Sequence, residues 1–393
     1  MPFDFNNPPS RRNTGSLKWD DMHSIFGPVP ADAIPLWVAD MDFPSPDAVV
    51  QAVQQAATRG IYGYPVDGRS CREAAVAWLA RRHGWNVEAT RLVTVPGVVP
   101  GVAMLIRELS APGDAVAVQT PVYPPLFQCI EAAGRRIARN QLLPPAAGGD
   151  GLYRMNLAQL ERLFREGVRL FILCSPHNPG GRVWSREELL ALGELCCAHD
   201  VTVIVDEIHH DLIMPGHRHT VFASLAPEIA QRTVTCVSSS KTFNLGGLPH
   251  AQLVMPDDAM RRRMVHAAAG RGLAHGNMFG MIASEAACLH GDQWLDALMG
   301  HIAANDALLR ETLQRELPLL VTMPLEGTYL PWIDCRALGL DEPELMRKLL
   351  ARGVVPSNGS FFGPGGEGYL RINLATSRSL LGTALERMVD ALR

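Results

Sequence analysis

The middle of this chain alternates short apolar runs with amphipathic segments, and this alternation restricts the possible folds more than any other feature. Five runs rich in β-branched residues lie at 115–119, 170–173, 201–205, 233–237 and 251–255. Residues 185–200 have helical spacing, with Ser185 as N-cap and Glu188 completing a capping box. Strands that alternate with helices predict an α/β fold with a mostly parallel sheet covered by helices.

The last hundred residues follow a different pattern. A long helical stretch at about 292–317 precedes YLPWIDC, the helix PELMRKLLARG, the strand YLRINLA and a closing helix. This order is typical of a small α+β domain, and we expect the extended, proline-rich first forty residues to complete it. We therefore predict an N-terminal segment 1–45 that joins the small domain, a large domain 46–288 and a small C-terminal domain 289–393.

Composition and charge narrow the class of partner. Apolar residues make up 47% of the chain and charged residues 19%, which excludes a disordered chain. The net charge is −4 and no basic block is present, so we expect neither nucleic acid nor a membrane surface as a partner. The longest apolar stretch, 92–106, is interrupted by proline and glycine, and the N-terminus has no apolar targeting segment. These features predict a cytoplasmic protein with a small-molecule partner.

Lysine and cysteine usage adds two constraints. Only three of the 36 basic residues are lysine, namely Lys18, Lys241 and Lys348, and arginine cannot supply an amine for chemistry because it does not deprotonate in proteins. None of the eight cysteines forms a C-x-x-C pair, so we interpret them as reduced, packed thiols.

Polar motifs follow three of the predicted strands. They are CSPHNPGG at 174–181, DEIHH at 206–210 and SSSKTFN at 238–244. Each has an ordinary interpretation alone, as a turn, a helix cap or a solvated loop. Together they place an amide, an acid, hydroxyls and a rare lysine at the carboxyl ends of strands in one sheet, where open α/β sheets bind ligands.

These are the groups that pyridoxal phosphate requires. A lysine amine forms the Schiff base, a carboxylate keeps the pyridine nitrogen protonated, and hydroxyls with backbone amides bind the phosphate. Residues 97–100 open a helical run and could supply such amides, and Tyr123 could supply an aromatic face for the ring. Arg371, in YLRINLA, is the candidate for binding a substrate carboxylate in bidentate fashion.

The chain resembles the class I/II (fold-type-I) aminotransferases, and within them the bacterial cystathionine β-lyase-like C–S lyases. The resemblance covers nearly the whole chain. It is carried by RRNTGSLKWD (11–20), LWVADMDF (36–43), YGYP (62–65), VPGVVPGV (95–102), TPVYPP (120–125), SPHNPGGRVW (175–184), VDEIHHDL (205–212), SSSKTFNLGGL (238–248), LEGTYLPWIDCR (325–336) and FGPGGEGYLRINLATS (362–377). It implies a large domain with a mostly parallel seven-stranded sheet and a smaller α+β domain.

The resemblance also implies roles for individual residues. Lys241 would be the Schiff-base lysine, Asp206 would pair with the pyridine nitrogen, and Asn178 would donate to the 3′-oxygen. The remaining cofactor contacts would come from Tyr123, stacked on the ring, and from the phosphate-binding residues Val98, Val99, Ser238 and Ser240. Arg371, Asn178 and the backbone of Ala39 would bind the substrate carboxylate. Tyr64 would reach the phosphate of the neighbouring subunit, which implies a homodimer.

Three positions depart from the aminotransferase pattern. Pro249 stands where many aminotransferases have a phosphate-binding arginine, and His209 stands where they often have tyrosine. Both departures are shared with the lyase subgroup. Pro124 follows Tyr123 where some relatives have a second tyrosine, so no acid or gating role transfers to that position.

Other candidates have ordinary interpretations that we prefer. His209, His210, His217 and His219 could suggest a metal, but the sequence shows no carboxylate or cysteine at ligand spacing, and we predict no metal site. Asp40 and Asp42 could form a carboxylate pair, although capping and shaping a loop is the simpler role. Trp37 could line the substrate entrance or pack in the core.

The function implied is a C–S β-lyase that cleaves cystathionine or another cysteine S-conjugate to a thiol, pyruvate and ammonia. An aminotransferase would use the same residues but require a keto-acid acceptor. A C–S lyase of a specialised pathway, acting on a large S-conjugate, is a further alternative, as is a regulatory protein that keeps the fold without turnover.

Overall fold

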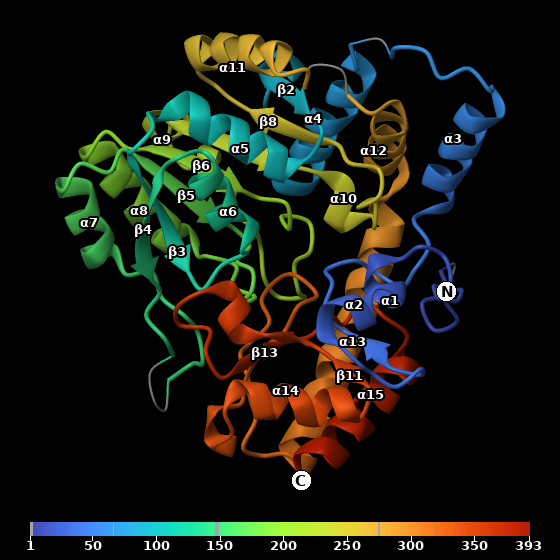
Figure 1. Ribbon diagram of the computed structural model, residues 1–393. Coiled ribbons are helices and arrows are strands. Elements are labelled where there is room, and N and C mark those ends of the chain that lie inside the picture. Colours follow the sequence, from blue (N-terminus) through green and yellow to red (C-terminus); the bar gives the residue numbers. More distant parts are fainter. Residues whose placement is uncertain (1–2, 66, 146–148, 274–275) are drawn as a thin grey trace.

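A seven-stranded sheet forms the centre of the computed structural model, which describes residues 3–65, 67–145, 149–273 and 276–393 (Figure 1). The strand order is β2-β8-β7-β6-β5-β3-β4. All neighbouring strands are parallel except β8, which runs antiparallel to both β2 and β7. The strands are β2 Leu92–Val95, β3 Ala115–Thr120, β4 Arg136–Gln141, β5 Leu170–Cys174, β6 Thr202–Asp206, β7 Thr233–Val237 and β8 Ala251–Val254. The predicted mostly parallel sheet is confirmed.

All five predicted strands are present, and the two that were not predicted, β2 and β4, are the edge strands of the sheet. The hydrophobic pattern of β4 explains why it was missed. Its sequence, RIARNQ, is largely polar, and its side chains are mostly exposed or half-buried. It lies at the edge of the sheet, paired with β3 alone. Because β4 buries little surface, it does not need the apolar run by which the five predicted strands were recognised.

Side chains alternate between the two faces of the sheet, and helices cover both. Val116, Val118 and Ile172 face α5 (Val98–Leu109), α6 (Pro125–Ala132) and α11 (Asp258–Gly270). Phe171 and Val203 face the opposite side, where α7 (Leu157–Arg165), α8 (Arg186–Ala198) and α9 (Pro227–Ala230) pack. This period of two gives the sheet two apolar faces, as expected for strands buried between helix layers.

The capping box predicted for α8 is present. The Ser185 hydroxyl accepts from the Glu188 N–H at 3.2 Å, and the Glu188 carboxylate accepts from the Ser185 N–H at 2.9 Å. Two orphan amides at the start of the helix are therefore satisfied reciprocally.

Further helices and short turns connect this sheet to the rest of the chain. Helices α3 (Asp47–Thr58) and α4 (Arg69–His83) both pack against α12 (Met278–His290). The short elements are η1 Ala89–Arg91, η2 Phe222–Ser224, α10 Ser239–Thr242, η3 Arg336–Leu338 and η4 Gly359–Phe362.

The C-terminal part of the chain forms a second, smaller sheet with its own helices (Figure 1). Its strand order is β12-β13-β10-β9, and its long helix, α13, matches the predicted helical stretch. The elements are α13 Asp292–Glu316, β9 Val321–Thr322, β10 Trp332–Asp334, α14 Glu342–Ala351, β11 Val354–Val355, β12 Ser357–Asn358, β13 Tyr369–Arg371 and α15 Arg378–Leu392.

The N-terminal segment lies against this smaller unit. Strand β1 (Ile34–Pro35) pairs in parallel with β11. The prediction of a wholly extended segment was wrong, because residues 17–26 form two short helices, α1 (Leu17–Asp20) and α2 (Met22–Phe26). The Ser16 hydroxyl caps α1 by accepting from the Trp19 N–H. The exact domain boundaries stay a prediction.

None of the described helices is both long enough and apolar enough to cross a bilayer.

Candidate active site

A cavity of about 300 Å³ lies where the carboxyl ends of β5, β6 and β7 meet the start of α5. Eight of the eleven predicted site residues line it: Ala39, Val98, Val99, Tyr123, Asn178, Asp206, Ser240 and Lys241. The fold thus brings together residues that are far apart in the sequence, with Ala39 and Lys241 separated by 202 positions. The remaining three, Ser238, Tyr64 and Arg371, lie elsewhere and are described below.

Lys241 lies on α10, the short helix that follows β7. The Ser238 hydroxyl caps this helix by accepting from the Ser240 N–H at 3.1 Å. The Lys241 Nζ donates to the Ala39 carbonyl at 2.6 Å. Burial lowers the pKa of Lys241 to about 8, helped by the positive charge of Arg371 and opposed by Asp40 and Asp206. A neutral, nucleophilic amine is therefore accessible near neutral pH.

Asp206 is the last residue of β6, and its carboxylate lines the cavity. Its Oδ1 accepts from the Ile208 N–H at 3.1 Å. Burial raises the pKa of Asp206 to about 6, and the Ile208 amide and the Lys241 charge act against that shift. Tyr123 lines the same cavity, and burial raises the pKa of its hydroxyl. A buried carboxylate of this kind stabilises a protonated ring nitrogen that lies against it.

The start of α5 supplies backbone amides at another side of the cavity. Gly97 precedes the helix with φ of 143°, a conformation that residues with a Cβ rarely adopt. The helix starts at Val98, and the N–H groups of its first turn have no partner within the helix. Such a terminus favours a bound anion.

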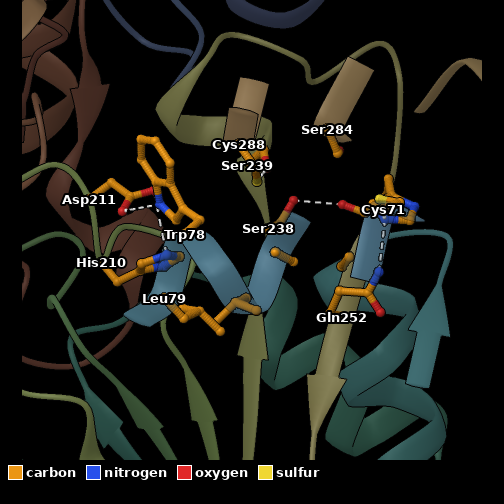
Figure 2. A pocket seen from close by; sticks show the side chains of 14 residues that line it. Cys71, Trp78, Leu79, His210, Asp211, Ser238, Ser239, Gln252, Ser284 and Cys288 are labelled. Carbon is orange, nitrogen blue, oxygen red and sulfur yellow. Dashed lines mark hydrogen bonds and ion pairs between the residues drawn. The ribbon is translucent and has the colours of Figure 1, made fainter. Parts of the chain in front are cut away.

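The two serines predicted to hold a phosphate differ in position. Ser240 lines the cavity, but Ser238 lines a neighbouring cavity of about 30 Å³ together with Cys71 and Trp78 (Figure 2). The Ser238 hydroxyl donates to the His250 carbonyl at 2.6 Å and lies 2.9 Å from the Ser240 Oγ. The structure therefore places Ser238 behind Ser240, where it caps α10 and orients its neighbour.

Arg371 lies on β13 of the smaller unit and reaches the site through Asn178. Its Nη1 donates to the Asn178 Oδ1 at 3.0 Å, and its Nη2 donates to the Trp37 carbonyl at 2.6 Å. The guanidinium is buried, and burial lowers its pKa to about 10. Among the ion pairs of the described residues none involves Arg371, so this buried cation lacks a carboxylate partner. A bound carboxylate would compensate its charge.

Three further residues shape the cavity or its wall. Pro249 and His209 line it, at the two positions where the sequence departs from the aminotransferase pattern. Burial lowers the pKa of His209 well below its ordinary value, so this imidazole is neutral. The Tyr329 hydroxyl donates to the Ala39 carbonyl at 3.1 Å. Sequence reasoning missed Tyr329, although it lies in the LEGTYLPWIDCR piece that carries the resemblance.

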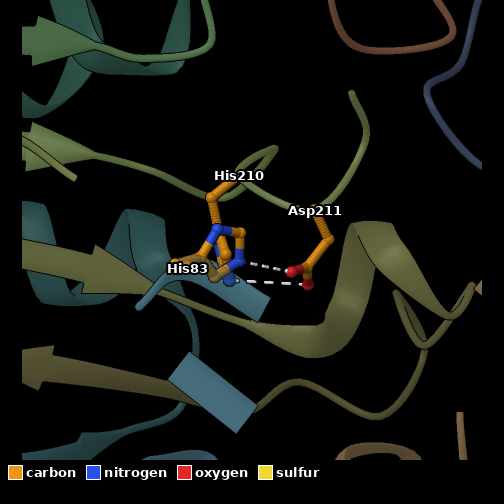
Figure 3. A group of neighbouring side chains, drawn as sticks. All are labelled: His83, His210 and Asp211. Carbon is orange, nitrogen blue, oxygen red and sulfur yellow. Dashed lines mark hydrogen bonds and ion pairs between the residues drawn. The ribbon is translucent and has the colours of Figure 1, made fainter. Parts of the chain in front are cut away.

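Asp211 forms a hydrogen-bonding hub beside α10, and sequence reasoning missed it and its partner His83. Its carboxylate accepts from Trp78 Nε1 at 2.9 Å and from the Thr242 hydroxyl at 2.8 Å. His83 Nε2 lies 2.8 Å from its Oδ1 and His210 Nε2 lies 3.4 Å from its Oδ2 (Figure 3). Thr242 follows Lys241, so the hub ties α10 to the segment after β6.

This hub includes one of the histidines considered for a metal. Within the described ranges, His83, His210 and Asp211 are the one group whose ligand atoms lie within 4.8 Å of one another. Both carboxylate oxygens of Asp211 already accept hydrogen bonds from Trp78 and Thr242. These hydrogen bonds, with that between His83 and Asp211, explain why the three side chains lie close together.

Tyr64 does not line this cavity. It lies between α3 and α4 with 92% of its surface exposed, beside Ile61 and Tyr62, which are also exposed.

The donor set of the cavity fits pyridoxal phosphate. An amine, a buried carboxylate and an aromatic face line one cavity with a helix N-terminus that favours an anion. Beyond them lies the unpaired guanidinium of Arg371, which matches the carboxylate of an amino acid.

Comparisons with known proteins agree with this arrangement. The model of the family "Aminotransferase class I and II" matches residues 31–388. The chain is 42% identical to cystathionine beta-lyase PatB of Bacillus subtilis (strain 168), covering 99% of this chain and 100% of that protein. It superimposes on the pyridoxal 5′-phosphate-containing cystalysin of Treponema denticola with a TM-score of 0.95 at 34% identity, covering 100% and 99% of the two chains.

A third match is the PLP-bound putative aminotransferase of Clostridium difficile 630, with a TM-score of 0.96 and 36% identity over the whole of both chains. The resemblance and the fold class inferred from the sequence are confirmed by these matches. From the cavity, the fold and the family model together, this chain is a member of the class I and II aminotransferase family.

Proposed function

We propose that this chain is a pyridoxal-phosphate-dependent C–S β-lyase that cleaves cystathionine or another cysteine S-conjugate. The observation that carries the amino-acid chemistry is the buried guanidinium of Arg371, which lacks a carboxylate and contacts Asn178 in the wall of the lysine-containing cavity. The choice of a lyase is supported by the full-length similarity to PatB and cystalysin. The N-terminal pieces at 11–20 and 36–43, shared with the lyase subgroup, support it as well.

The cofactor would be held by residues on several sides of the cavity. Asp206 would face the pyridine nitrogen, Tyr123 would cover the ring, and Asn178 would donate to the 3′-oxygen. The amides of Val98 and Val99 and the hydroxyl of Ser240 would bind the phosphate, with Ser238 acting through Ser240. When bound, pyridoxal phosphate stabilises negative charge that develops at the Cα of an attached amino acid.

The residues of this chain would then act on the substrate in a defined order. Arg371, with Asn178 and the backbone of Ala39, holds the α-carboxylate and so fixes the Cα near Lys241. The Lys241 amine, with its pKa lowered to about 8, accepts the Cα proton as general base. The electron pair of that C–H bond forms a Cα–Cβ double bond as the Cβ–S bond breaks and the thiolate leaves. The released 2-aminoacrylate takes up water to give pyruvate and ammonia.

The functional unit would be a homodimer. The segment that carries Ile61, Tyr62 and Tyr64 leaves all three large side chains exposed, and an exposed apolar cluster of this kind favours a partner surface. We propose that a second copy covers it and that Tyr64 reaches the phosphate of the neighbouring cavity.

The stoichiometry of products tests the proposed reaction. We expect cystathionine or another cysteine S-conjugate to give pyruvate, ammonia and free thiol in equal amounts, with no keto acid added. Lys241→Ala is the matched control and should release none of them. If turnover requires 2-oxoglutarate or pyruvate as acceptor and yields a new amino acid without thiol, the protein is an aminotransferase and the lyase proposal is wrong.

A further inference from the structure

The loop at residues 39–43 carries the carbonyl that contacts the reactive lysine. Both Lys241 Nζ and the Tyr329 hydroxyl donate to the Ala39 carbonyl, at 2.6 and 3.1 Å. The large unit holds the loop through Asn244, whose Oδ1 accepts from the Met41 N–H at 2.9 Å. The smaller unit holds it through Asn373, whose Nδ2 donates to the carbonyls of Val38 and Asp40, each at 2.6 Å.

A third set of contacts comes from the N-terminal segment and is charged. The Arg11 guanidinium binds the Asp40 carboxylate with both Nη atoms, at 2.9 and 2.8 Å, and Nη1 also donates to the Met41 carbonyl. Lys18 Nζ lies 3.0 Å from the Asp42 Oδ1 and donates to the Asp40 carbonyl at 3.3 Å. The same Asp42 oxygen accepts from Trp19 Nε1 at 2.7 Å. Arg11, Lys18, Trp19, Asp40 and Asp42 form what we call the N-terminal clamp.

Burying the charged groups of the clamp costs desolvation free energy, and the fold already has a large apolar core to stabilise it. Lys18 is fully buried, and the Asp42 side chain is 3% exposed. The desolvation of such a pair largely cancels its attraction, so a buried ion pair contributes little stability. Buried charge pairs can instead fix one conformation, and this pair lies on the loop that contacts Lys241. The location indicates a role in function.

The clamp also sets the charge that Lys241 experiences. The charged and titratable groups around Lys241 are Asp206 at the end of β6, His209 after that strand, Arg371 on β13, and Asp40 on the loop. Asp40 favours the protonated form of the amine, whereas Arg371 disfavours it. Arg11, paired with Asp40, and Lys18, whose Nζ lies 3.8 Å from the Asp40 Oδ1, offset the negative charge of that carboxylate.

We propose that the N-terminal clamp positions the catalytic centre, by holding the Ala39 carbonyl against the Lys241 amine and by compensating the charge of Asp40. Its members are positioning residues, because they act through Ala39 and Asp40. The inference rests on the proposed role of Lys241 as the base, and it assigns a function to the RRNTGSLKWD motif that the reaction itself leaves unexplained.

The scarcity of lysine makes a direct test possible. The full-length chain, labelled with ¹³C at the lysine Cε and prepared without cofactor, contains three labelled groups, and Lys241→Arg assigns one of them. In Arg11→Gln, Asp40 loses its bidentate partner and keeps the more distant Lys18, so the titration midpoint of Lys241 should rise by about half a pH unit or more. In Arg11→Lys, which keeps the charge, the midpoint should stay closer to its wild-type value than in Arg11→Gln.

Arg12→Gln is the matched control. Arg12 is the neighbouring residue of the same type. Its guanidinium donates to the carbonyls of Ala31 and Ala33 and lies 5.1 Å from the centre of the Trp19 ring, so its substitution removes a charge and a ring contact but leaves the Arg11–Asp40 pair in place. Its substitution should leave the Lys241 midpoint unchanged. Circular dichroism and urea unfolding of each variant separate a local effect from loss of folding.

A second variant tests the positioning role without leaving a buried charge unpaired. Lys18→Met combined with Asp42→Leu removes both charges together and replaces the two side chains by apolar ones of similar size. In the loaded enzyme kcat should fall about tenfold or more while KM changes less, because misplacement of the base affects proton transfer more than carboxylate binding.

The outcomes separate this inference from the proposed function. If Arg11→Gln folds but shifts the midpoint no more than Arg12→Gln, and the Lys18→Met/Asp42→Leu protein keeps its kcat, the clamp is merely structural and the inference is wrong. If Arg11→Gln does not fold, the paired variant decides alone. Absence of thiol release by the wild-type chain would contradict the proposed function, whereas the Lys241 titration requires no turnover and tests the clamp independently.

Discussion

At the scale of single residues, burial opposes the charged form of each titratable group in the cavity. It lowers the pKa of Lys241 to about 8 and that of Arg371 to about 10, and it raises the pKa of Asp206 to about 6. The protein therefore buries two basic groups and one carboxyl group whose charges its own side chains do not fully compensate. A bound cofactor and amino acid would supply the missing charges, which favours binding of those ligands.

The lowered pKa of Lys241 predicts the pH dependence of cofactor loading. A lysine whose pKa has fallen from 10.5 to about 8 is largely neutral above pH 8, and the neutral amine is the form that attacks an aldehyde. We expect the rate at which the cofactor-free protein takes up pyridoxal phosphate to rise with pH and to level off above about 8. Stopped-flow absorbance measures this rate. A rise that continues to about pH 10 would show that the lysine is unperturbed.

Truncation of Arg371 predicts a loss of substrate binding with little loss of cofactor. Removing one partner of a buried, hydrogen-bonded charge pair costs about 2–5 kcal/mol, so Arg371→Ala should raise KM for the amino acid strongly. Arg371→Lys should recover part of the loss, because an ammonium keeps the charge without the bidentate geometry. Steady-state kinetics and cofactor titration measure the two effects. An equally large loss of pyridoxal phosphate would mean that Arg371 is structural.

Residue-scale prediction from the sequence worked where a motif follows a strand. Lys241, Asp206 and Asn178 were placed together because their strands are neighbours in a parallel sheet. Ser238 was predicted to bind the phosphate but lies behind Ser240, and Asp211 was not predicted, because a capping hydroxyl and a hub carboxylate depend on three-dimensional neighbours. Likewise, no sequence pattern indicated that Asp40 pairs with Arg11.

At the scale of elements, the start of α5 depends on one glycine. Gly97 has φ of 143° and connects β2 to the helix, whose first residues Val98 and Val99 line the cavity. A Cβ at this position would meet Pro100 at 3.5 Å, so the backbone angle is the stronger obstacle.

Gly97→Ala should therefore strain the turn and weaken phosphate binding. We expect the affinity for pyridoxal phosphate to fall at least severalfold, with a cost of about 1–2 kcal/mol for holding a residue with a Cβ at this φ. Gly113→Ala, at another glycine with positive φ and open space around its Cβ, is the control for a general backbone effect. Fluorescence titration of both proteins makes the comparison, and equal affinities in the two would contradict the role of the turn.

Element prediction succeeded where burial leaves a pattern in the sequence. The five apolar strands and α8 with its capping box were recognised because each buries a face or satisfies its own amides. The edge strands β2 and β4 and the helices α1 and α2 were missed, because short or half-exposed elements are fixed by their neighbours more than by their own periodicity.

At the scale of the whole molecule, the candidate site is assembled from parts of the chain that are distant in sequence. The larger unit provides Lys241 on α10 and Asp206 at the end of β6, β13 of the smaller unit provides Arg371, and the N-terminal segment provides Ala39. Any relative movement of the units would change the distance between the base and the carboxylate-binding group. The clamp and Asn373 therefore hold the N-terminal loop at the point where all three parts meet.

In the proposed dimer, Tyr64 of the neighbouring chain would add a fourth part to the site. Mixing two inactive or weakened variants tests this proposal. Tyr64→Phe removes the hydroxyl proposed to reach the partner's phosphate, and Lys241→Ala removes the base. A dimer that contains one chain of each kind has one cavity with both changes and one cavity with neither. Co-refolding or co-expression of the two should therefore restore about one intact cavity per mixed dimer, whereas each variant alone stays impaired. If Tyr64 served only its own chain, every cavity would carry one defect and activity would not return. A fully active monomer in sedimentation experiments would likewise overturn the assignment of Tyr64 across an interface.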